Sequence, residues 1–163
     1  MSRVVQGLTV AEAKALIHQQ AAHGGMPCPV CARPVACYDR RFNAGMARTL
    51  VWLVEASEYG KRFVSLRRDA PRFVLVNREH ARMRNYGVIE CADPDSVRTA
   101  SSGRWRPTPR GILFVRGRIV LPKFLTYLFN EVVGQSSDLI GIADALAEPF
   151  DIRNIRRHVA SWS

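Results

Sequence analysis

The sequence has little lysine, little cysteine and no long apolar run, and each shortage excludes something. Its 4 Cys among 163 residues are unevenly spaced, which argues against a disulfide framework. No segment approaches the ~18 uncharged apolar residues of a membrane span. The residues up to His18 lack the basic-then-apolar order of a signal peptide. We therefore expect a cytoplasmic protein whose thiols either bind a metal or lie buried.

Positive charge is abundant and is concentrated in the middle of the chain. The basic side chains are 21 Arg and 3 Lys, which favours planar donors that bind two acceptor atoms at once. Residues 61–123 carry 15 positive and 5 negative side chains, against 6 and 4 in residues 1–60 and 3 and 5 in residues 124–163. The middle segment thus accounts for the whole net charge of +10. This asymmetry predicts a polyanion-binding surface, and a solvated basic face without a partner is the alternative.

Local signals predict two helices before the basic segment. Thr9 and Glu12 have the spacing of a capping box and open a helix that runs to about Ala22. Asn43 can cap a second, apolar helix that ends near Tyr59. Between these helices, residues 26–38 hold three Pro and three of the four Cys, so we expect irregular structure there.

A third helix is predicted within the basic segment, after a short strand at residues 63–66. Asp69 and Pro71 suit its cap and first turn, and Gly87 suits its end. At helical spacing this helix has an apolar face and a polar face. The apolar face consists of Phe73, Val76, His80 and Met83, and the polar face of Arg78, Arg82 and Asn85.

A β-hairpin with a long tip is predicted directly after this helix. Residues 88–91 and 104–108 are strand-like, and residues 92–103 between them are rich in turn-forming residues. Thr108 and Pro109 then suit the cap and first position of a short helix. That helix is expected to end at Val115.

The remaining chain gives weaker signals. Residues 124–133 fit either a hairpin turning at Asn130 or a helix, and helices are predicted at residues 138–146 and 151–160. Residues 138–163 could form a surface that pairs two copies of the chain. We expect one compact domain with the following parts. These are an amino-terminal helix and Cys-rich segment (residues 1–41), a core (residues 42–121) and a carboxy-terminal extension that packs on the core (residues 122–163).

The order of these elements resembles that of winged helix-turn-helix proteins. Residues 84–90 resemble the end of a recognition helix entering the first wing strand, and residues 105–115 resemble the second wing strand followed by a Thr-x-x-Gly turn. With Cys28-Pro-Val-Cys31, the layout is also similar to uncharacterised small proteins of bacteriophages and prophages. The resemblance implies an α+β fold. A winged helix-turn-helix core would be flanked by an amino-terminal helix with a Cys-rich loop and by a carboxy-terminal helical extension.

The resemblance also implies double-stranded DNA as the partner. A recognition helix enters the major groove, where Arg can pair with guanine and Asn with adenine, while wing residues neutralise phosphates. The alternative for some arginines is an ion pair with Glu79, Glu90, Asp93 or Asp95. The side chains implied for DNA contact are Arg67, Arg68, Arg72, Arg78, Arg82, Arg84, Asn85, Arg98, Arg104 and Arg106.

The cysteines raise the hypothesis of a structural zinc site. Cys28 and Cys31 have the spacing at which two thiolates on one turn bind one side of a tetrahedral ion. Cys37 and His23 could complete a shell of three Cys and one His, and Cys91 is an alternative fourth ligand. Relict or buried thiols that bind no metal are the competing interpretation.

We expect no enzymatic activity, because the sequence has no phosphate-binding Gly loop, paired-carboxylate motif or nucleophile elbow. The leading hypothesis is a phage-type DNA-binding protein that regulates transcription or replication in the host cytoplasm. The alternative is a phage protein-interaction module that binds an acidic host protein, such as a polymerase, nuclease or defence factor, through the same basic surface. RNA is the third choice, because no aromatic stacking platform is evident.

Overall fold

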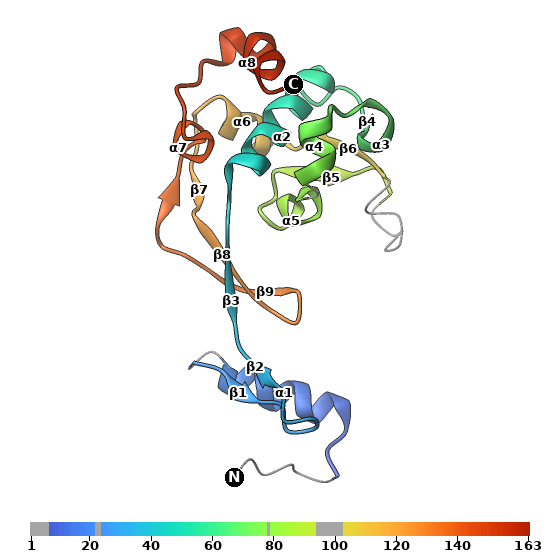
Figure 1. Ribbon diagram of the computed structural model, residues 1–163, viewed down its shortest axis with the longest axis vertical. Helices are drawn as coiled ribbons and strands as arrows, with labels where there is room; N and C mark the ends of the chain where they lie inside the picture. Colours follow the sequence, from blue (N-terminus) through green and yellow to red (C-terminus); the bar gives the residue numbers. More distant parts are fainter. Residues whose placement is uncertain (1–6, 22–23, 78, 94–102) are drawn as a thin grey trace. The chain divides into compact units, whose positions relative to one another are not determined.

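The computed structural model describes residues 7–21, 24–77, 79–93 and 103–163, and the chain forms two compact units. The first comprises residues 1–40 and 124–135, and the second comprises residues 41–123 and 136–163. Residues 122–163, expected to form one extension, are thus divided between the two units. Helices and strands occur in both units (Figure 1), which confirms the predicted α+β class.

Helix α1 (Val10–Gln20) belongs to the first unit and begins with the capping box that the sequence predicts. The Thr9 hydroxyl accepts the backbone N–H of Glu12 at 3.3 Å, and the Glu12 carboxylate accepts the backbone N–H of Thr9 at 2.8 Å. The helix buries Ile17 against Ala21 and Leu128. Half-buried side chains surround this small cluster, namely Met26, Cys28, Val35 and Cys37.

Short strands form the rest of the first unit. The segment expected to be irregular contains a minimal hairpin, and the ambiguous segment near residue 130 forms a hairpin rather than a helix. Phe129 and Asn130 have φ values of 53° and 66°, the positive values that a tight two-residue hairpin turn requires. The strands are β1 (Met26–Pro27), β2 (Pro34–Val35), β3 (Tyr38–Arg41), β8 (Phe124–Leu128) and β9 (Glu131–Gln135), in sheets β1-β2 and β3-β8-β9.

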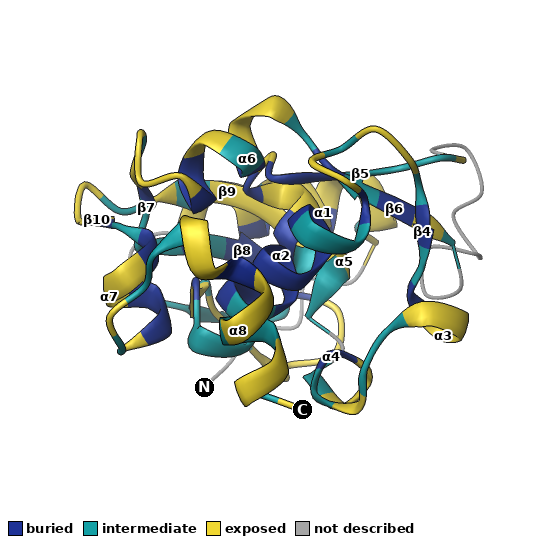
Figure 2. Cartoon of the chain, turned by 90° about the horizontal axis from the view of Figure 1, so that it is seen from above, coloured by how far each residue is buried: buried dark blue, intermediate teal, exposed yellow. Residues whose placement is uncertain are grey.

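Helix α2 (Ala44–Ala56) is the central helix of the second unit and is buried along most of its length (Figure 2). Asn43 caps it as predicted, because its side-chain oxygen accepts the backbone N–H of Met46 at 2.9 Å. Leu50 and Val54 are fully buried. The other large side chains of this core include Phe42, Trp105 and Phe114, each 0% exposed.

A three-stranded antiparallel sheet lies in the same unit, with strand order β4-β6-β5. Strand β4 (Val64–Ser65) confirms the strand predicted near residue 63, and β5 (Ile89–Cys91) with β6 (Arg104–Pro107) confirms the predicted hairpin. Trp105 on the central strand is opposite Val64 on one side and Cys91 on the other. Its burial anchors the sheet to the core.

The single helix predicted from Pro71 to Gly87 is wrong. The chain between β4 and β5 instead forms three short helices, α3 (Leu66–Asp69), α4 (Arg72–Asn77) and α5 (His80–Asn85). Val74 and Met83 are both buried, although they are about 2.5 turns apart at 3.6 residues per turn. A straight helix would place them on opposite sides, so the break lets both face the core. Val76, predicted for the apolar face, is 72% exposed.

Helix α6 (Pro109–Val115) follows the hairpin and is capped by Thr108 as predicted. The Thr108 hydroxyl accepts the backbone N–H of Gly111 at 3.2 Å and donates to the Gly87 carbonyl at 2.6 Å. A Cβ atom on Gly111 would collide with the carbonyl oxygen of Val88. Glycine at this position therefore permits the close approach of α6 to the start of the hairpin.

The carboxy-terminal segment of the second unit differs partly from the prediction. The helix predicted at residues 138–146 begins only at residue 142, because residues 139–140 pair with residues 121–122 as strands. Asp151 caps the next element as predicted, accepting the backbone N–H of Arg153 at 3.0 Å. The elements are β7 (Leu121–Pro122), β10 (Leu139–Ile140), α7 (Ile142–Leu146), the 3₁₀ helix η2 (Ile152–Asn154) and α8 (Ile155–Ser161).

Candidate functional site

Exposed polar side chains of the predicted DNA-contact set lie on α5 and on the elements before and after it. Arg84 and Asn85 are exposed at the end of α5. In the described part of the chain, four arginines of the predicted set make no salt bridge. They are Arg67 on α3, Arg72 on α4, Arg84 on α5 and Arg104 on β6, all exposed.

Three other arginines of the predicted set are held by carboxylates. Two of them, Arg82 and Arg106, form the ion pairs with Glu79 and Glu90 that the sequence analysis gave as the alternative to DNA contact. Arg106 also lies over the ring of Phe63, with its Cζ atom 4.4 Å from the ring centroid. The three pairs are Arg82 with Glu79 at 2.8 Å, Arg106 with Glu90 at 2.6 Å, and Arg68 with Asp69 at 2.8 Å.

Not every predicted residue can be placed, because Arg78, Arg98 and His23 lie outside the described residues. His80 is half-buried, and its ring meets that of Trp105 edge-on at a centroid distance of 5.6 Å. Its place in the core agrees with its predicted position on the apolar face of the helix.

The turn from Cys28 to Cys31 is held by backbone hydrogen bonds to the sulfur and the carbonyl oxygen of Cys28. The backbone N–H groups of Cys31 and Val30 donate to the Cys28 sulfur and hold the pKa of this thiol below its usual value. The Ala32 N–H donates to the Cys28 carbonyl at 2.9 Å, and Ala32 has a φ of 59°. The turn closes between β1 and β2 with Cys31 exposed and Cys28 half-buried.

The described residues do not complete a metal site at this turn. Cys37 is half-buried and packs against the cluster of Ile17, Ala21 and Leu128. Cys91 lies on β5 in the second unit. Among residues 7–21, 24–77, 79–93 and 103–163, no three His, Cys, Asp or Glu side chains are close enough to share a metal ion.

A cavity of about 460 Å³ between α2, α4 and the end of the chain was missed by the sequence analysis. Its residues come from three distant segments, so no local motif links them. The one available signal is Arg48, a charged side chain within a helix that is otherwise largely apolar. The cavity is lined by Gly45, Arg48, Arg72, Phe73, Val76, Asn77, Trp162 and Ser163.

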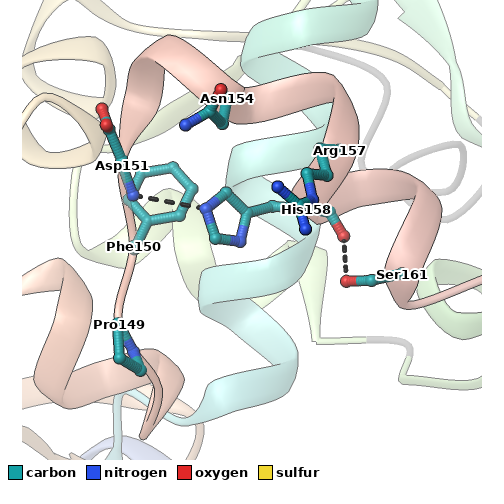
Figure 3. Close-up of a pocket in the computed structure, with 7 residues that line it drawn as sticks. All are labelled: Pro149, Phe150, Asp151, Asn154, Arg157, His158 and Ser161. Atoms are coloured by element: carbon teal, nitrogen blue, oxygen red, sulfur yellow. Dashed lines mark hydrogen bonds between the residues drawn. The ribbon is translucent and has the colours of Figure 1, made fainter.

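Another cavity, of about 440 Å³, contains Asp151, His158 and Ser161 (Figure 3). These side chains do not form a hydroxyl–imidazole–carboxylate relay. The imidazole Nε2 of His158 accepts the backbone N–H of Asp151 at 3.3 Å, and the Ser161 hydroxyl donates to the backbone carbonyl of His158 at 2.7 Å. The Asp151 carboxylate binds Arg153. The imidazole is therefore not placed to take a proton from Ser161.

Within the described residues, no helix has the length and apolar character needed to cross a bilayer. No protein family, no curated protein and no solved structure matches this chain.

Proposed function

We propose that the second unit is a winged-helix domain that binds duplex DNA. One observation carries this proposal, namely the chain order and pairing of its elements. Helix α2, strand β4, helices α3 to α5 and the β5–β6 hairpin follow one another, and β4 pairs with the second strand of the hairpin. A winged helix has this same order, in which α5 would be the recognition helix and the hairpin would be the wing.

The distribution of exposed polar side chains supports the same orientation on DNA. Arg84 and Asn85 are exposed on α5 and have the side chains that pair with guanine and adenine edges in the major groove. Arg104 on the wing strand, with Arg67 and Arg72 before α5, would contact phosphates on either side. The phosphates of duplex DNA would balance the excess positive charge of residues 61–123.

The paired arginines have a different role in this proposal. Arg82 and Arg106 are bound to Glu79 and Glu90, so each would have to exchange a carboxylate for a phosphate before contacting DNA. We therefore assign them to stabilising the start of α5 and the pairing of β5 with β6. Because the sequence resembles small phage proteins, we propose control of phage transcription or replication in the host cytoplasm as the biological role.

Fluorescence anisotropy on labelled duplexes over a salt series tests the proposal. We expect affinity to fall steeply with salt, because each neutralised phosphate releases counterions. The double variant Arg84→Ala with Asn85→Ala should lose preference among duplex sequences, whereas Arg104→Ala should weaken all duplexes alike and lower the salt slope by about 1. Arg157→Ala on α8, which also removes one exposed arginine, is the matched control and should bind as the parent does.

Two outcomes would overturn the DNA assignment. One is weak binding that is equal for duplex DNA, single-stranded DNA and an RNA hairpin and is lost at physiological salt. The other is binding that Arg157→Ala weakens as much as the α5 variant does. Either result would favour the alternative that the basic surface binds an acidic host protein.

We also propose that Cys28 and Cys31 form half of a structural zinc site. The N–H groups that point at the Cys28 sulfur and the positive φ of Ala32 are the features of a turn that holds two thiolates on one metal ion. Cys37 and His23 remain the proposed completing ligands. A zinc site would supply stability that the small cluster around Ile17 cannot supply alone.

A further inference from the structure

The cavity between α2, α4 and the end of the chain contains hydrogen-bond donors without acceptors. The Nε atom of Arg48 and the Nδ2 atom of Asn77 are both buried, and neither makes a hydrogen bond within the described residues. Both residues line the same cavity. Folded proteins pair nearly all of their buried donors, so a bound acceptor that these two side chains turn to meet would relieve the cost of leaving both donors unpaired.

Aromatic rings form much of the cavity wall. Phe73 and Trp162 meet edge-on with their ring centroids 6.0 Å apart. The Cζ atom of Arg48 lies over the Trp162 ring, 5.6 Å from its centroid. The indole N–H of Trp162 donates to Glu148 at 2.7 Å, which fixes the orientation of the ring. The cavity therefore has a rigid apolar wall beside a guanidinium group.

The charged side chains that line the cavity are all basic. None of its described lining residues is acidic, whereas Arg48 and Arg72 are both basic. The first turn of α2, which includes Gly45 of the lining, also carries no acidic residue. A helix N-terminus attracts negative charge, so α2 adds to the field of the two arginines. A carboxylate is the acceptor that this environment favours.

The rim of the cavity is apolar. Val76 on α4 is 72% exposed and lines the cavity beside Phe73. A nucleic acid backbone would leave these side chains without an apolar partner. Trp and Arg beside exposed aliphatic side chains are instead the composition of protein–protein contact centres.

We propose that this cavity binds an acidic segment of a partner protein. A Glu or Asp carboxylate of the partner accepts hydrogen bonds from Arg48 and Asn77, and an adjacent aliphatic side chain packs against Phe73 and Val76. The site shares Arg72 with the residues assigned to phosphate contact, but it uses neither the α5 residues nor the wing residue assigned to DNA. Peptide binding and base recognition can therefore be tested separately, although both sites lie in the second unit.

Nuclear magnetic resonance with the full chain provides the test. The probe is a short acetylated peptide with Glu-Leu-Glu in a Gly/Ser background. Its controls are the Gln-Leu-Gln and Glu-Gly-Glu peptides and a random DNA duplex. We expect the probe to shift the Arg48 Nε–H, Asn77 side-chain amide and Trp162 indole signals, and to bind at least about tenfold more tightly than either control peptide, because charged acceptors and apolar contact both contribute.

Matched variants locate the binding. Arg48→Met keeps the aliphatic stem but removes the donor, and it should abolish the selectivity for Glu over Gln. Arg118→Met removes an exposed arginine that is not part of the lining and should leave probe binding unchanged. If Arg48→Met does not fold, as its amide spectrum would show, Arg72→Met on the exposed side of the cavity replaces it and should lower the selectivity.

The proposal is overturned if the Gln peptide binds as well as the Glu peptide, or if Arg118→Met weakens binding as much as the cavity variant. It is also overturned if the DNA duplex, and not the peptide, shifts the Arg48 and Asn77 signals. Loss of preference among duplex sequences in the Arg84 and Asn85 variant, with intact peptide binding, would separate the two functions.

Discussion

The two units of this chain differ in how they are held together. The second unit surrounds α2 with large buried side chains, among them Trp105, Phe42 and Phe114. The first unit buries a small cluster of Ile17, Ala21 and Leu128, with thiols around it. Small units with few buried side chains generally need a metal or another cross-link. We therefore expect metal removal to destabilise the first unit and truncation of a large core side chain to destabilise the second.

Metal removal should have the largest effect and should be confined to the first unit. We expect the purified chain to carry zinc, and chelation to unfold α1 and the β1–β2 hairpin, because structural zinc contributes on the order of 10 kcal/mol to folding in small metal-dependent units. Elemental analysis and amide hydrogen exchange provide the measurement. Cys28→Ser should reproduce the effect, and Cys91→Ser is the matched control. A metal-free chain with a protected α1 would contradict the zinc hypothesis.

Phe114→Ala should have the next largest effect, and on the second unit. Phe114 is 0% exposed and packs edge-on against Phe42 at a centroid distance of 5.3 Å. Its truncation should cost about 3–5 kcal/mol of unfolding free energy through lost burial and the cavity left behind. Denaturant unfolding followed by hydrogen exchange would show which unit responds. Equal loss of protection in α1 would mean that the units unfold together, and the comparison would fail.

Helix caps offer a smaller, matched perturbation of each unit. Thr108→Ala removes a cap that also donates to Gly87, and it should destabilise the second unit by about 1–2 kcal/mol. Thr9→Ala removes the exposed capping box of α1 and should cost about 1 kcal/mol in the first unit only. Urea midpoints read from signals of each unit would check both values. Serine at either position should restore most of the loss.

Acid should have the smallest effect. The hydrogen bonds from Arg68 hold the pKa of Asp69 below its usual value, and those of Thr9 do the same for Glu12. Each pair therefore contributes stability above the unfolded pKa of about 4, and this contribution is lost as pH falls through the folded pKa. Asp69→Asn should reduce the loss of stability at acid pH in the second unit alone. Thermal unfolding measured from neutral pH to about pH 3 would show this. Because both carboxylates are exposed, a large change would indicate another titrating group.

The sequence predicted best those features that depend on neighbouring residues. Thr9, Asn43 and Thr108 each cap a helix where expected, since capping is a contact between residues three positions apart. The β5–β6 hairpin was also predicted, because turn-forming residues separate its strands. The α4–α5 break was missed because periodicity alone cannot show that Val74 and Met83 face the same core.

Features that depend on distant residues were not predictable from local pattern. Strands β7 and β10 pair across the whole β8–β9 hairpin, and nothing near residue 139 signals a partner near residue 121. The cavity donors Arg48 and Asn77 meet Trp162 only through tertiary packing. The sequence shows which predicted DNA-contact residues are charged, but it does not show which of them form ion pairs. Arg106, for example, meets Glu90 because the register of β5 and β6 places them opposite each other.

Gly111 also defines how relatives of this chain could be identified. Its hydrogen atom is the only substituent that fits against the Val88 carbonyl oxygen, and the residue that caps its helix precedes it by three positions. Any side chain at this position would push α6 away from the start of the hairpin. A distant descendant whose sequence has otherwise diverged should therefore still show a hydroxyl residue followed three places later by glycine, directly after a strand that carries a buried aromatic residue.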